Sequence, residues 1–235
     1  MLHSKDEIFH SLSKVPLFRK LDEGSLRGIS ELAEEKTLAK NGVLFRQGDP
    51  GDAFYVVMSG SLKLTVVEED YNFTLAVLGP LDYLGEMALI ECFPRSATAE
   101  SLEDCRLICI RRPAFMASLR ANVELALALM VGLAHRLRQT NHDTAAVVHL
   151  DLYRRLAQKL IALAATRGEE TEDGVRIDVP VSAQTLAEML GAERPAVEAL
   201  LNALERQQVI RRSNERLELL DVGPLLDPKF PYRLS

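Results

Sequence analysis

Residues 116–147 read MASLRANVELALALMVGLAHRLRQTNHDTAAV, and this stretch decides how the chain is organised. Apolar and small residues recur in it at separations of three and four without a break, which is the a/d seam of a heptad repeat. The seam consists of Met116, Leu119, Val123, Ala126, Met130, Leu133, Leu137, Thr140, Thr144 and Val147. The pattern predicts one long helix, beginning near Pro113, whose first part is buried nearly all round and whose later part pairs with a second copy of itself. Leu125, Leu127 and Leu129 lie off the seam, so we expect them to face the core of their own chain.

Two threonines near the end of this helix occupy seam positions where Leu would pack better. They are Thr140 and Thr144. One interpretation is polar tapering toward the helix end. The other is that the seam holds a polar ligand at Thr140. The spacing of the seam does not distinguish the two.

Length and composition fit a globular protein of one large or two modest domains. The chain has 235 residues, of which 47% are hydrophobic and 26% charged. Its longest apolar stretch, residues 125–134, is far shorter than a membrane span, and its N-terminus has no apolar leader. The three cysteines, Cys92, Cys105 and Cys109, have no paired spacing and no neighbouring histidine. We therefore expect a cytoplasmic protein with no membrane partner and no cysteine-bound metal.

The chain between Thr37 and about Arg111 has the pattern of an antiparallel β structure. Short apolar runs alternate there with turn sequences rich in Gly, Pro and Asn. The runs are residues 43–45, 54–58, 62–67, 75–78 and 107–110. This spacing predicts an antiparallel barrel or jelly roll. The preceding residues 5–36 predict short helices with a break at Val15-Pro16.

A further helix is predicted after the long one. Asp151 is a candidate N-cap, and the apolar spacing continues through Thr166. A polar loop follows at residues 167–174. Near the C-terminus, residues 209–220 alternate across a turn at Ser213-Asn214, which indicates a small β wing.

A helix-turn-helix is predicted between that loop and the wing. Ser182 caps a helix that reaches Leu190, and Gly191 then breaks it. Pro195 opens a second helix that runs to about Gln208. Two short helices joined through a Gly-containing turn are typical of DNA-binding modules, although a helix pair also occurs as ordinary packing.

Residues 84–98, LGEMALIECFPRSAT, carry the residue types that bind a phosphorylated sugar. From a pocket mouth, Arg95 would offer a charge-assisted fork to a phosphate, and backbone N–H groups at the start of a short helical turn would face the same anion. The Glu86 carboxylate would accept a hydrogen bond from a sugar hydroxyl. The other interpretation is a surface Arg–Glu salt bridge worth under about 1 kcal/mol. The spacing leaves both open.

The sequence from about Phe18 to Leu220 resembles the cyclic-AMP receptor protein (catabolite activator) family. The resemblance is most specific in the cassette Gly85-Glu86-Met87-Ala88-Leu89 and Arg95-Ser96-Ala97. It implies an α+β chain with three parts. These are a cyclic-nucleotide-binding β-roll (jelly roll) in residues 1–112, a dimerisation helix and hinge in 113–149, and a winged helix-turn-helix in 150–235.

The resemblance also implies a set of ligand contacts. The residues concerned are Gly85, Glu86, Arg95, Ser96, Ala97, Thr140 and Asn141. By resemblance, Glu86 takes the ribose 2′-hydroxyl, and Arg95 with Ser96 takes the cyclic phosphate. Thr140 contacts the base from its own subunit, and Asn141 contacts it from the partner. Family members more often have Ser in place of Asn141, so Asn141 leaves the base preference open. The resemblance implies cyclic AMP as the first effector expected, with cyclic GMP as the other candidate.

No metal or haem is expected, although other family members sense gases through such groups. The N-terminal arm has no cysteine. The three histidines of the long helix, His135, His142 and His149, recur every seven residues, which places them about 10 Å apart along a helix. This separation is too long for one metal ion. We expect these histidines to lie on the solvated surface.

The helix-turn-helix segment also resembles the family, with a weaker match. Ser182 and Gln184 fall where family members touch DNA phosphates, and Arg194 falls on the first base-reading Arg, which suits guanine. On the wing, Arg211, Arg212 and Arg216 are further cations. The residues implied to lie at DNA are Ser182, Gln184, Arg194, Glu198, Arg211 and Arg212.

Two departures from the family weaken the expectation of DNA binding. Ala199 stands where a second Arg or Lys is usual, and Glu193 and Glu198 place acids on the groove-facing side. Residues 145–235 contain 12 Lys and Arg against 14 Asp and Glu, a net charge of −2. The whole chain carries −6, which argues against a protein that coats nucleic acid but does not exclude a local basic face.

Three hypotheses for function follow. The first is a regulator that binds palindromic DNA as a homodimer when a cyclic nucleotide re-sets the long helix and a hinge near residues 149–151, with RNA polymerase as a candidate further partner. The second is a nucleotide sensor with a degenerate helix-turn-helix that acts through a protein partner. The third is an enzyme, which we do not expect, because Arg95 and Glu86 form a binding pair without a nucleophile or base. Activation or repression, the controlled genes and the DNA site cannot be deduced.

Overall fold

The computed structural model describes the backbone of residues 5–68, 71–149, 151–213 and 216–226; the side chains of residues 68, 71, 139 and 141–149 lie outside the description. The chain forms two compact units, residues 1–70 with 76–140, and residues 71–75 with 141–235. Among the described residues, no single helix is long and apolar enough to cross a membrane. Residues 112–121 and 123–138 reach the length and apolar composition of a membrane span only when taken together, and these two helices are bent by 109° relative to each other.

The first unit begins with short helices, as predicted. They are α1 (Lys5–Lys14), the 3-10 turn η1 (Pro16–Phe18) and α2 (Glu23–Leu32). The predicted break at Val15-Pro16 is confirmed, because the chain leaves the helix at Val15 and Pro16 opens the 3-10 turn. Asp22 caps α2 by accepting a hydrogen bond from the Ser25 N–H at 2.9 Å.

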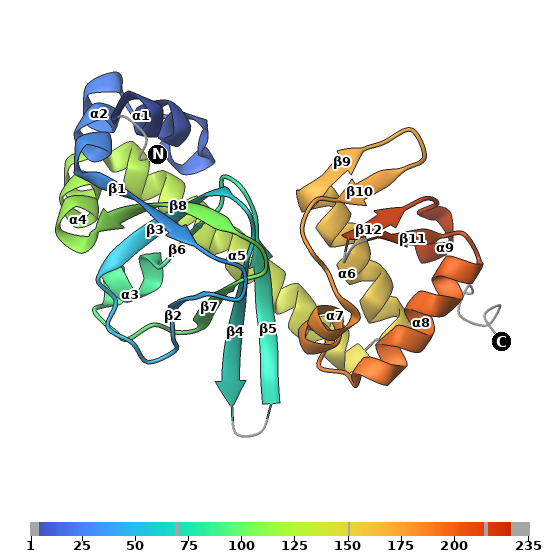
Figure 1. Cartoon of the computed structure of the whole chain (residues 1–235). Helices are drawn as coiled ribbons and strands as arrows, with labels where there is room; N and C mark the ends of the chain where they lie inside the picture. Colours follow the sequence, from blue (N-terminus) through green and yellow to red (C-terminus); the bar gives the residue numbers. More distant parts are fainter. Residues whose placement is uncertain (1–4, 69–70, 150, 214–215, 227–235) are drawn as a thin grey trace. The chain divides into compact units, whose positions relative to one another are not determined.

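Eight strands follow and form the predicted jelly roll. They are β1 (Ala33–Leu38), β2 (Val43–Phe45), β3 (Ala53–Ser59), β4 (Leu62–Glu68), β5 (Tyr71–Leu78), β6 (Tyr83–Leu84), β7 (Thr98–Ser101) and β8 (Cys105–Arg111). Two four-stranded sheets result, with strand orders β1-β8-β3-β6 and β2-β7-β4-β5 (Figure 1). The five predicted runs all lie in strands. The polar β1 and the short β6 and β7 lack an apolar run, so the sequence did not reveal them.

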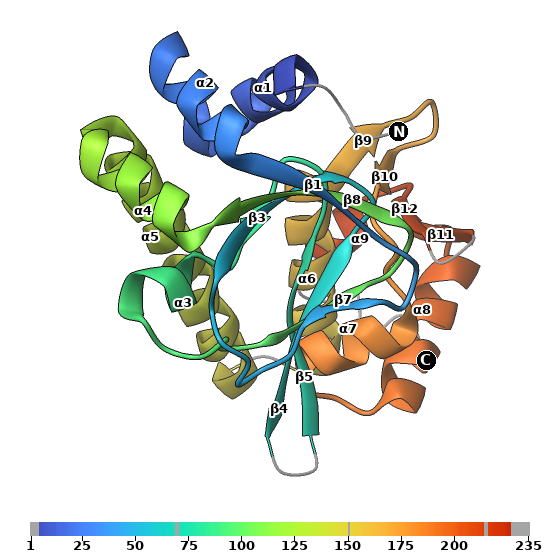
Figure 2. The same cartoon turned by 60° about the vertical axis from the view of Figure 1, so that its left-hand side comes forward.

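Alternation along β3 divides the unit into two cores. Phe54 and Val56 face a core made with α1, α2 and α4 (Arg112–Ala121), which lie on one side of β1, β3 and β8 (Figure 1). Tyr55 and Val57 face the interior of the roll, whose backbone Figure 2 shows, and they pack there against residues of both sheets. Both cores therefore depend on the period-two pattern of one buried strand.

The predicted long helix is two helices. Pro113 opens α4, which ends at Ala121, and α5 (Val123–His149) starts after Asn122. The two meet at 109°, so the seam does not continue back to Met116 and Leu119, which pack against the first core instead. The heptad pattern bridged this corner because two unrelated apolar faces happened to have compatible spacing.

The faces of α5 are also partly different from the prediction. Leu125 and Leu129 are buried, as expected, but Leu127 is 46% exposed, so its expected place in the core is wrong. Leu133, a predicted seam residue, packs against the first core. An exposed stripe with separations of four and three runs along the helix instead. It consists of Val123, Leu127, Met130, Ala134 and Leu137.

The second unit contains the predicted helix-turn-helix and wing. Its elements are α6 (Leu152–Arg167), β9 (Gly168–Glu170), β10 (Val175–Ile177), α7 (Ala183–Leu190), α8 (Arg194–Arg206), β11 (Ile210–Ser213), β12 (Arg216–Leu219) and α9 (Gly223–Leu226). The strands form one sheet in the order β11-β12-β10-β9. The loop predicted at residues 167–174 is confirmed only for residues 171–174, because residues 168–170 form β9, which pairs with β10. The turn predicted at Ser213-Asn214 lies partly outside the described residues.

Candidate nucleotide site and nucleic-acid interface

A left-handed glycine opens the short helix of the cassette. Gly85 has φ of 92° and precedes α3 (Glu86–Glu91), which is the short helical turn predicted in the cassette. A Cβ atom at Gly85 would lie 2.6 Å from a guanidinium nitrogen of Arg95 and 2.8 Å from the Ala53 carbonyl oxygen. Both the turn and the close approach of Arg95 therefore require glycine here.

Arg95 is a buried cation rather than a side chain at a pocket mouth. It is 3% exposed and donates hydrogen bonds to the carbonyl oxygens of Ala53, at 2.8 Å, and Gly85, at 3.1 Å. Its guanidinium lies 4.2 Å from the centre of the Phe45 ring, and Asp52 approaches it to 3.6 Å. Burial lowers its pKa, with Tyr55 and Asp52 opposing that shift. Its Nε has no partner among the described residues, so the group can accept an anion.

A cavity of about 500 Å³ opens onto Arg95. Its size is within the range of pockets that hold small ligands. The lining is charged and mixed in sign, with one buried aromatic ring. It consists of Glu34, Glu35, Lys36, Leu44, Phe45, Asp49, Pro50, Asp52, Tyr55, Arg95, Cys109 and Arg111.

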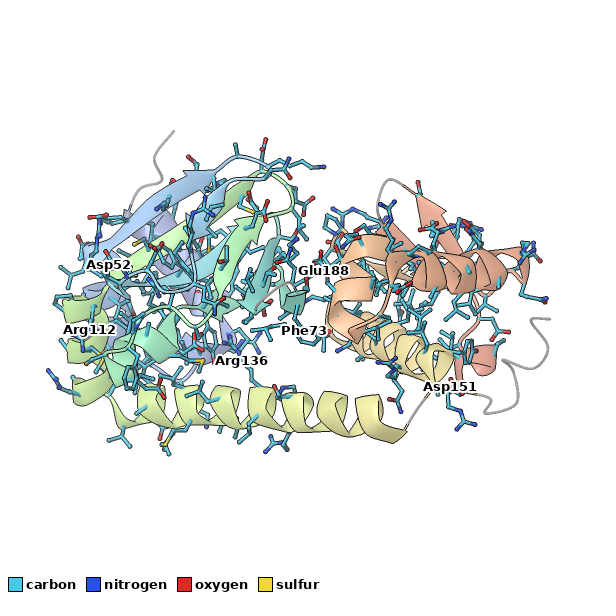
Figure 3. All side chains as sticks on the ribbon, turned by 90° about the horizontal axis from the view of Figure 1, so that it is seen from below. Asp52, Phe73, Arg112, Arg136, Asp151 and Glu188 are labelled. Atoms are coloured by element: carbon cyan, nitrogen blue, oxygen red, sulfur yellow. The ribbon has the colours of Figure 1, made fainter. Side chains whose placement is uncertain are left out.

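Glu86 is the second buried charge of the cassette, and its partner is Arg136. It is 1% exposed, and its Oε1 accepts a hydrogen bond from Arg136 at 2.7 Å. Arg136 points from α5 toward the roll and also donates to the Tyr83 carbonyl oxygen at 2.6 Å (Figure 3). The surface Glu86–Arg95 salt bridge is therefore wrong. Glu86 Oε2 is buried and has no hydrogen-bond partner among the described residues.

The other predicted ligand residues differ in burial and in their contacts with the cassette. Ala97 is buried and Ser96 exposed, both directly after Arg95. Thr140 is exposed, and its hydroxyl donates to the Arg136 carbonyl oxygen at 3.1 Å, one helical turn away. The side chain of Asn141 lies outside the described residues. The structure thus joins Arg95 to Gly85, which precedes Glu86, and Thr140 bonds Arg136, whose side chain binds Glu86.

No group of three or more His, Cys, Asp or Glu side chains suited to a metal ion occurs within the described part of the chain. His135 is exposed, as predicted for the outward face of the helix. His142 and His149 have side chains outside the described residues.

The turn of the helix-turn-helix is built as its residues predicted. The Ser182 hydroxyl caps α7 by accepting from the Thr185 N–H at 3.0 Å. Gly191 ends α7 with φ of 58°, and Pro195 lies in the first turn of α8. Gln184 is exposed on α7. The side chains predicted to meet DNA phosphates therefore occupy the beginning of the first helix.

Arg194 is the free cation at the start of the second helix. It is exposed and forms no ion pair with any described residue, which suits the base-reading role predicted for it. Ala199 is also exposed, so the position that usually carries a second cation presents only a methyl group. Glu198 is turned toward the wing.

The arginines of the wing are held by carboxylates. Arg212 bonds Glu198 at 2.8 Å and Glu205 at 2.8 Å, and it also contacts Asn202. Although partial burial opposes its charge, the hydrogen bonds to Glu198 and Glu205 raise its pKa. The hydrogen bond from Arg212 likewise lowers the pKa of Glu205. The predicted DNA contact of Arg212 stays a prediction, because in the structure its guanidinium joins the wing to α8.

Arg211 and Arg216 are paired in the same way but nearer to solvent. Arg211 binds Asp173 at 2.8 Å and Glu218 at 3.0 Å, and the hydrogen bond to Asp173 raises its pKa. Arg216 binds Asp178 at 2.8 Å. The charge that the wing presents to a DNA backbone is therefore smaller than a count of its arginines suggests.

Comparison with known proteins gives the same division of the chain. The cyclic nucleotide-binding domain family matches residues 35–122, and the Crp-like helix-turn-helix domain family matches residues 154–227. The cyclic AMP receptor protein of Thermus thermophilus is 30% identical over 80% of this chain and 84% of its own length. The CRP-like cAMP-activated global transcriptional regulator of Mycobacterium tuberculosis is 26% identical over 90% of this chain and 97% of its own.

Solved structures share the fold. FixK2 from Bradyrhizobium japonicum has a TM-score of 0.73 at 19% identity, covering 82% of this chain and 95% of that one. The two matched family models, a cyclic nucleotide-binding domain and a Crp-like helix-turn-helix domain, together define the class of cyclic-nucleotide-responsive transcription regulators. Within that class, the chain belongs to the cyclic AMP receptor protein family, as the relative from Thermus thermophilus shows. The family consists of transcription regulators.

Proposed function

We propose that the chain is a homodimeric transcription regulator that binds palindromic DNA when a cyclic nucleotide occupies the cassette. The observation that supports this most strongly is the pair of buried, incompletely bonded charges. Arg95 Nε and Glu86 Oε2 are both buried and lack hydrogen-bond partners among the described residues. Buried polar atoms without partners are costly in a folded protein, so a ligand that supplies both an anion and a hydroxyl group would stabilise this site.

A cyclic nucleotide has both groups next to each other. The cyclic phosphate would bind Arg95 with Ser96, the 2′-hydroxyl of the ribose would donate to Glu86, and Thr140 with the partner's Asn141 would contact the base. We propose cyclic AMP as the effector, with cyclic GMP as the second candidate. Two relatives are themselves described as cAMP-activated or as cyclic AMP receptors.

The exposed stripe of α5 supports the homodimer. Its residues are apolar, and four of them are 46–72% exposed in the single chain. Separations of four and three are the spacing of a two-helix seam. We therefore propose that residues 123–137 pair with a second copy, and we keep residues 1–112, 113–149 and 150–235 as the sensor, dimerisation and DNA-binding parts.

The DNA-binding part would use the beginning of both helices of the helix-turn-helix. Arg194 would read a guanine in the major groove, and Ser182 with Gln184 would contact phosphates. Binding of the nucleotide would re-set α5 and thereby the spacing of two such helices in the dimer. RNA polymerase is the proposed further partner.

Calorimetry with cyclic AMP and cyclic GMP tests the nucleotide site. We expect saturable binding of one of them, and Glu86→Gln should weaken it by about 1.5–3 kcal/mol, since a charged hydrogen bond is lost. Glu91→Gln is the matched control, because Glu91 is exposed on the same short helix. Equal affinities of the wild type and Glu86→Gln, or no binding of either nucleotide by the folded wild type, would contradict the proposal.

A second candidate function is favoured by the ion pairs of the wing. With Arg211 and Arg212 bound to carboxylates and Ala199 on the groove-facing side, the unit offers few free cations to a DNA backbone. In this alternative, the chain senses the nucleotide and acts through a protein partner. Selection from random DNA at low salt with nucleotide-saturated protein separates the two functions, because only the first predicts an enriched palindrome.

A further inference from the structure

The long helix has one residue without a side chain on its core-facing side. That side of α5 carries Leu125, Leu129 and Leu133, which pack against the helices and strands of the same unit, and Arg136, which binds Glu86. Gly132 lies among them. A Cβ atom at Gly132 would lie 1.9 Å from the hydroxyl oxygen of Tyr83 and 3.2 Å from its Cζ. The Tyr83 hydroxyl therefore occupies the space that the side chain of any other residue would need.

Tyr83 is fixed on its other sides. Its ring stacks on Phe54, with centres 5.5 Å apart, and Phe54 in turn stacks on Phe115 at 4.3 Å. The Arg136 guanidinium lies 4.7 Å from the Tyr83 ring centre and donates to the Tyr83 carbonyl oxygen. The Tyr83 side chain thus fills the space that Gly132 leaves open on α5. Because Tyr83 stands three residues before Glu86, this contact joins α5 to the strand that leads into the cassette.

The contact between Tyr83 and Gly132 fixes the position of α5 along its axis and its rotation about that axis. A shift by one residue moves a helix about 1.5 Å and turns it about 100°. Such a shift would bring Val131 or Leu133 onto the Tyr83 hydroxyl, where there is no room for a Cβ atom. The helix can therefore change its register only if Tyr83 moves too. Since Arg136 bonds both Tyr83 and Glu86, a ligand that rearranges Glu86 changes the same set of contacts.

We propose that Tyr83 and Gly132 are positioning residues that set the register of α5 against the nucleotide cassette and thereby the affinity for the nucleotide. The inference rests on the proposed nucleotide site and names how that site is coupled to the dimerisation helix. Glycine weakens the interior of a helix, so its presence at this point of α5 is explained by the close approach of Tyr83.

A double-mutant cycle tests the contact. The four proteins are the full-length wild type, Gly132→Ala, Tyr83→Phe and Gly132→Ala with Tyr83→Phe. In the Tyr83 background, Gly132→Ala should lower the affinity for cyclic AMP about tenfold or more, because the new methyl group displaces α5 and with it Arg136. In the Phe background, the same change should cost less than about threefold, since the clashing oxygen is gone.

Gly28→Ala is the matched control for helix propensity. Gly28 lies within α2, and a Cβ atom there would meet no atom within 4 Å. This variant should raise the unfolding temperature slightly and leave the cyclic AMP affinity unchanged. It shows what replacing a helical glycine does when no close contact is present.

The outcomes separate this inference from the proposed function. If Gly132→Ala lowers the unfolding temperature but binds cyclic AMP like the wild type, the contact is only structural and the proposal is overturned. It is also overturned if Gly132→Ala costs the same affinity in both backgrounds. If the wild type binds neither cyclic AMP nor cyclic GMP, the proposed function fails. If Gly132→Ala also lowers the unfolding temperature equally in the wild-type and Tyr83→Phe backgrounds, the contact between Tyr83 and Gly132 is contradicted as well.

Discussion

At the scale of single residues, two buried charges carry the chemistry. Arg95 is surrounded by carbonyl oxygens and an aromatic ring, and Glu86 by Arg136. An isolated buried charge is costly, and each of these two has only part of its bonding capacity used. The site is preorganised, because hydrogen bonds already hold the Arg95 guanidinium in place. Its side chain therefore loses little conformational freedom when an anion binds.

Replacing Arg95 tests the phosphate contact. Arg95→Gln should reduce the affinity for the cyclic nucleotide by about 1.5–3 kcal/mol, the range of a charged hydrogen bond. It should also lower the unfolding temperature, since the buried carbonyl oxygens of Ala53 and Gly85 lose their donor. Calorimetry well below the unfolding transition separates the two effects. A folded Arg95→Gln protein with wild-type affinity would remove Arg95 from the site.

The sequence grouped Gly85, Glu86 and Arg95 in one cassette, and the structure brings them together, but the ion pair of Glu86 with Arg136 was not predicted. The residue types at Gly85, Glu86 and Arg95 indicated a phosphorylated sugar, and the roles that the resemblance implied for them stay predictions. The partnership of Glu86 with Arg136 was missed because the two stand 50 residues apart, and only folding brings α5 to the cassette. The burial of Arg95 was also missed, because charged residues usually lie at the surface. The one available signal was the position of Arg136, one turn before Thr140.

At the scale of elements, α5 shows what a heptad pattern can and cannot predict. Val123, Met130 and Leu137 belong both to the predicted seam and to the exposed stripe. The two differ in the residues between these three, because a helix offers apolar neighbours on either side of the shared positions. Only the location of the protomer's own core decides between them. That core takes Leu133 and leaves Leu127 in solvent.

Charge substitutions on α5 distinguish the two faces. Leu137→Lys should yield monomers, because it places an unpaired charge in the proposed dimer seam while the protomer stays folded. Leu133→Lys should instead lower the unfolding temperature, since it places the charge against the protomer's core. Sedimentation velocity at micromolar concentration and thermal unfolding measure the two effects. A dimeric Leu137→Lys protein would contradict the proposed seam.

The wing arginines should divide by the strength of their ion pairs. Exposed pairs are weak, so Arg211 can exchange Asp173 for a phosphate, and Arg211→Ala should flatten the salt dependence of DNA binding by about one phosphate. Arg212 bonds three side chains of α8, so Arg212→Ala should cost about 1 kcal/mol of unfolding free energy. DNA titrations at several salt concentrations and denaturant unfolding check these results. If Arg211→Ala lowers the unfolding free energy and Arg212→Ala flattens the salt dependence instead, this prediction is wrong.

At the scale of the whole molecule, the net charge opposes sequence-independent binding to DNA. The chain carries a net charge of −6, and residues 145–235 carry −2. Sequence-independent attraction to DNA is therefore weak, and base contacts must supply much of the affinity. Arg194 is the cation best placed for this, because it is exposed at the start of α8.

Substitutions on α8 test this dependence. Arg194→Ala should cost about 1–3 kcal/mol on the cognate site and relax specificity at one base pair of each half-site. Ala199→Arg should raise DNA affinity or alter the preferred sequence. Competition binding against a panel of single-base variants measures both. If Arg194→Ala binds every site as the wild type does, α8 does not read bases.

Coupling of nucleotide binding to DNA binding is the measurement that tests the proposed function most directly. A palindrome selected from random DNA is titrated with the wild type and with Arg95→Gln, each with and without saturating cyclic AMP. We expect the nucleotide to raise the affinity of the wild type at least about tenfold, which is within the usual range of allosteric coupling. Arg95→Gln should show little of this increase at the same nucleotide concentration. If nucleotide-saturated wild type enriches no sequence, or binds its palindrome equally with and without nucleotide, the chain is not a nucleotide-controlled DNA-binding regulator.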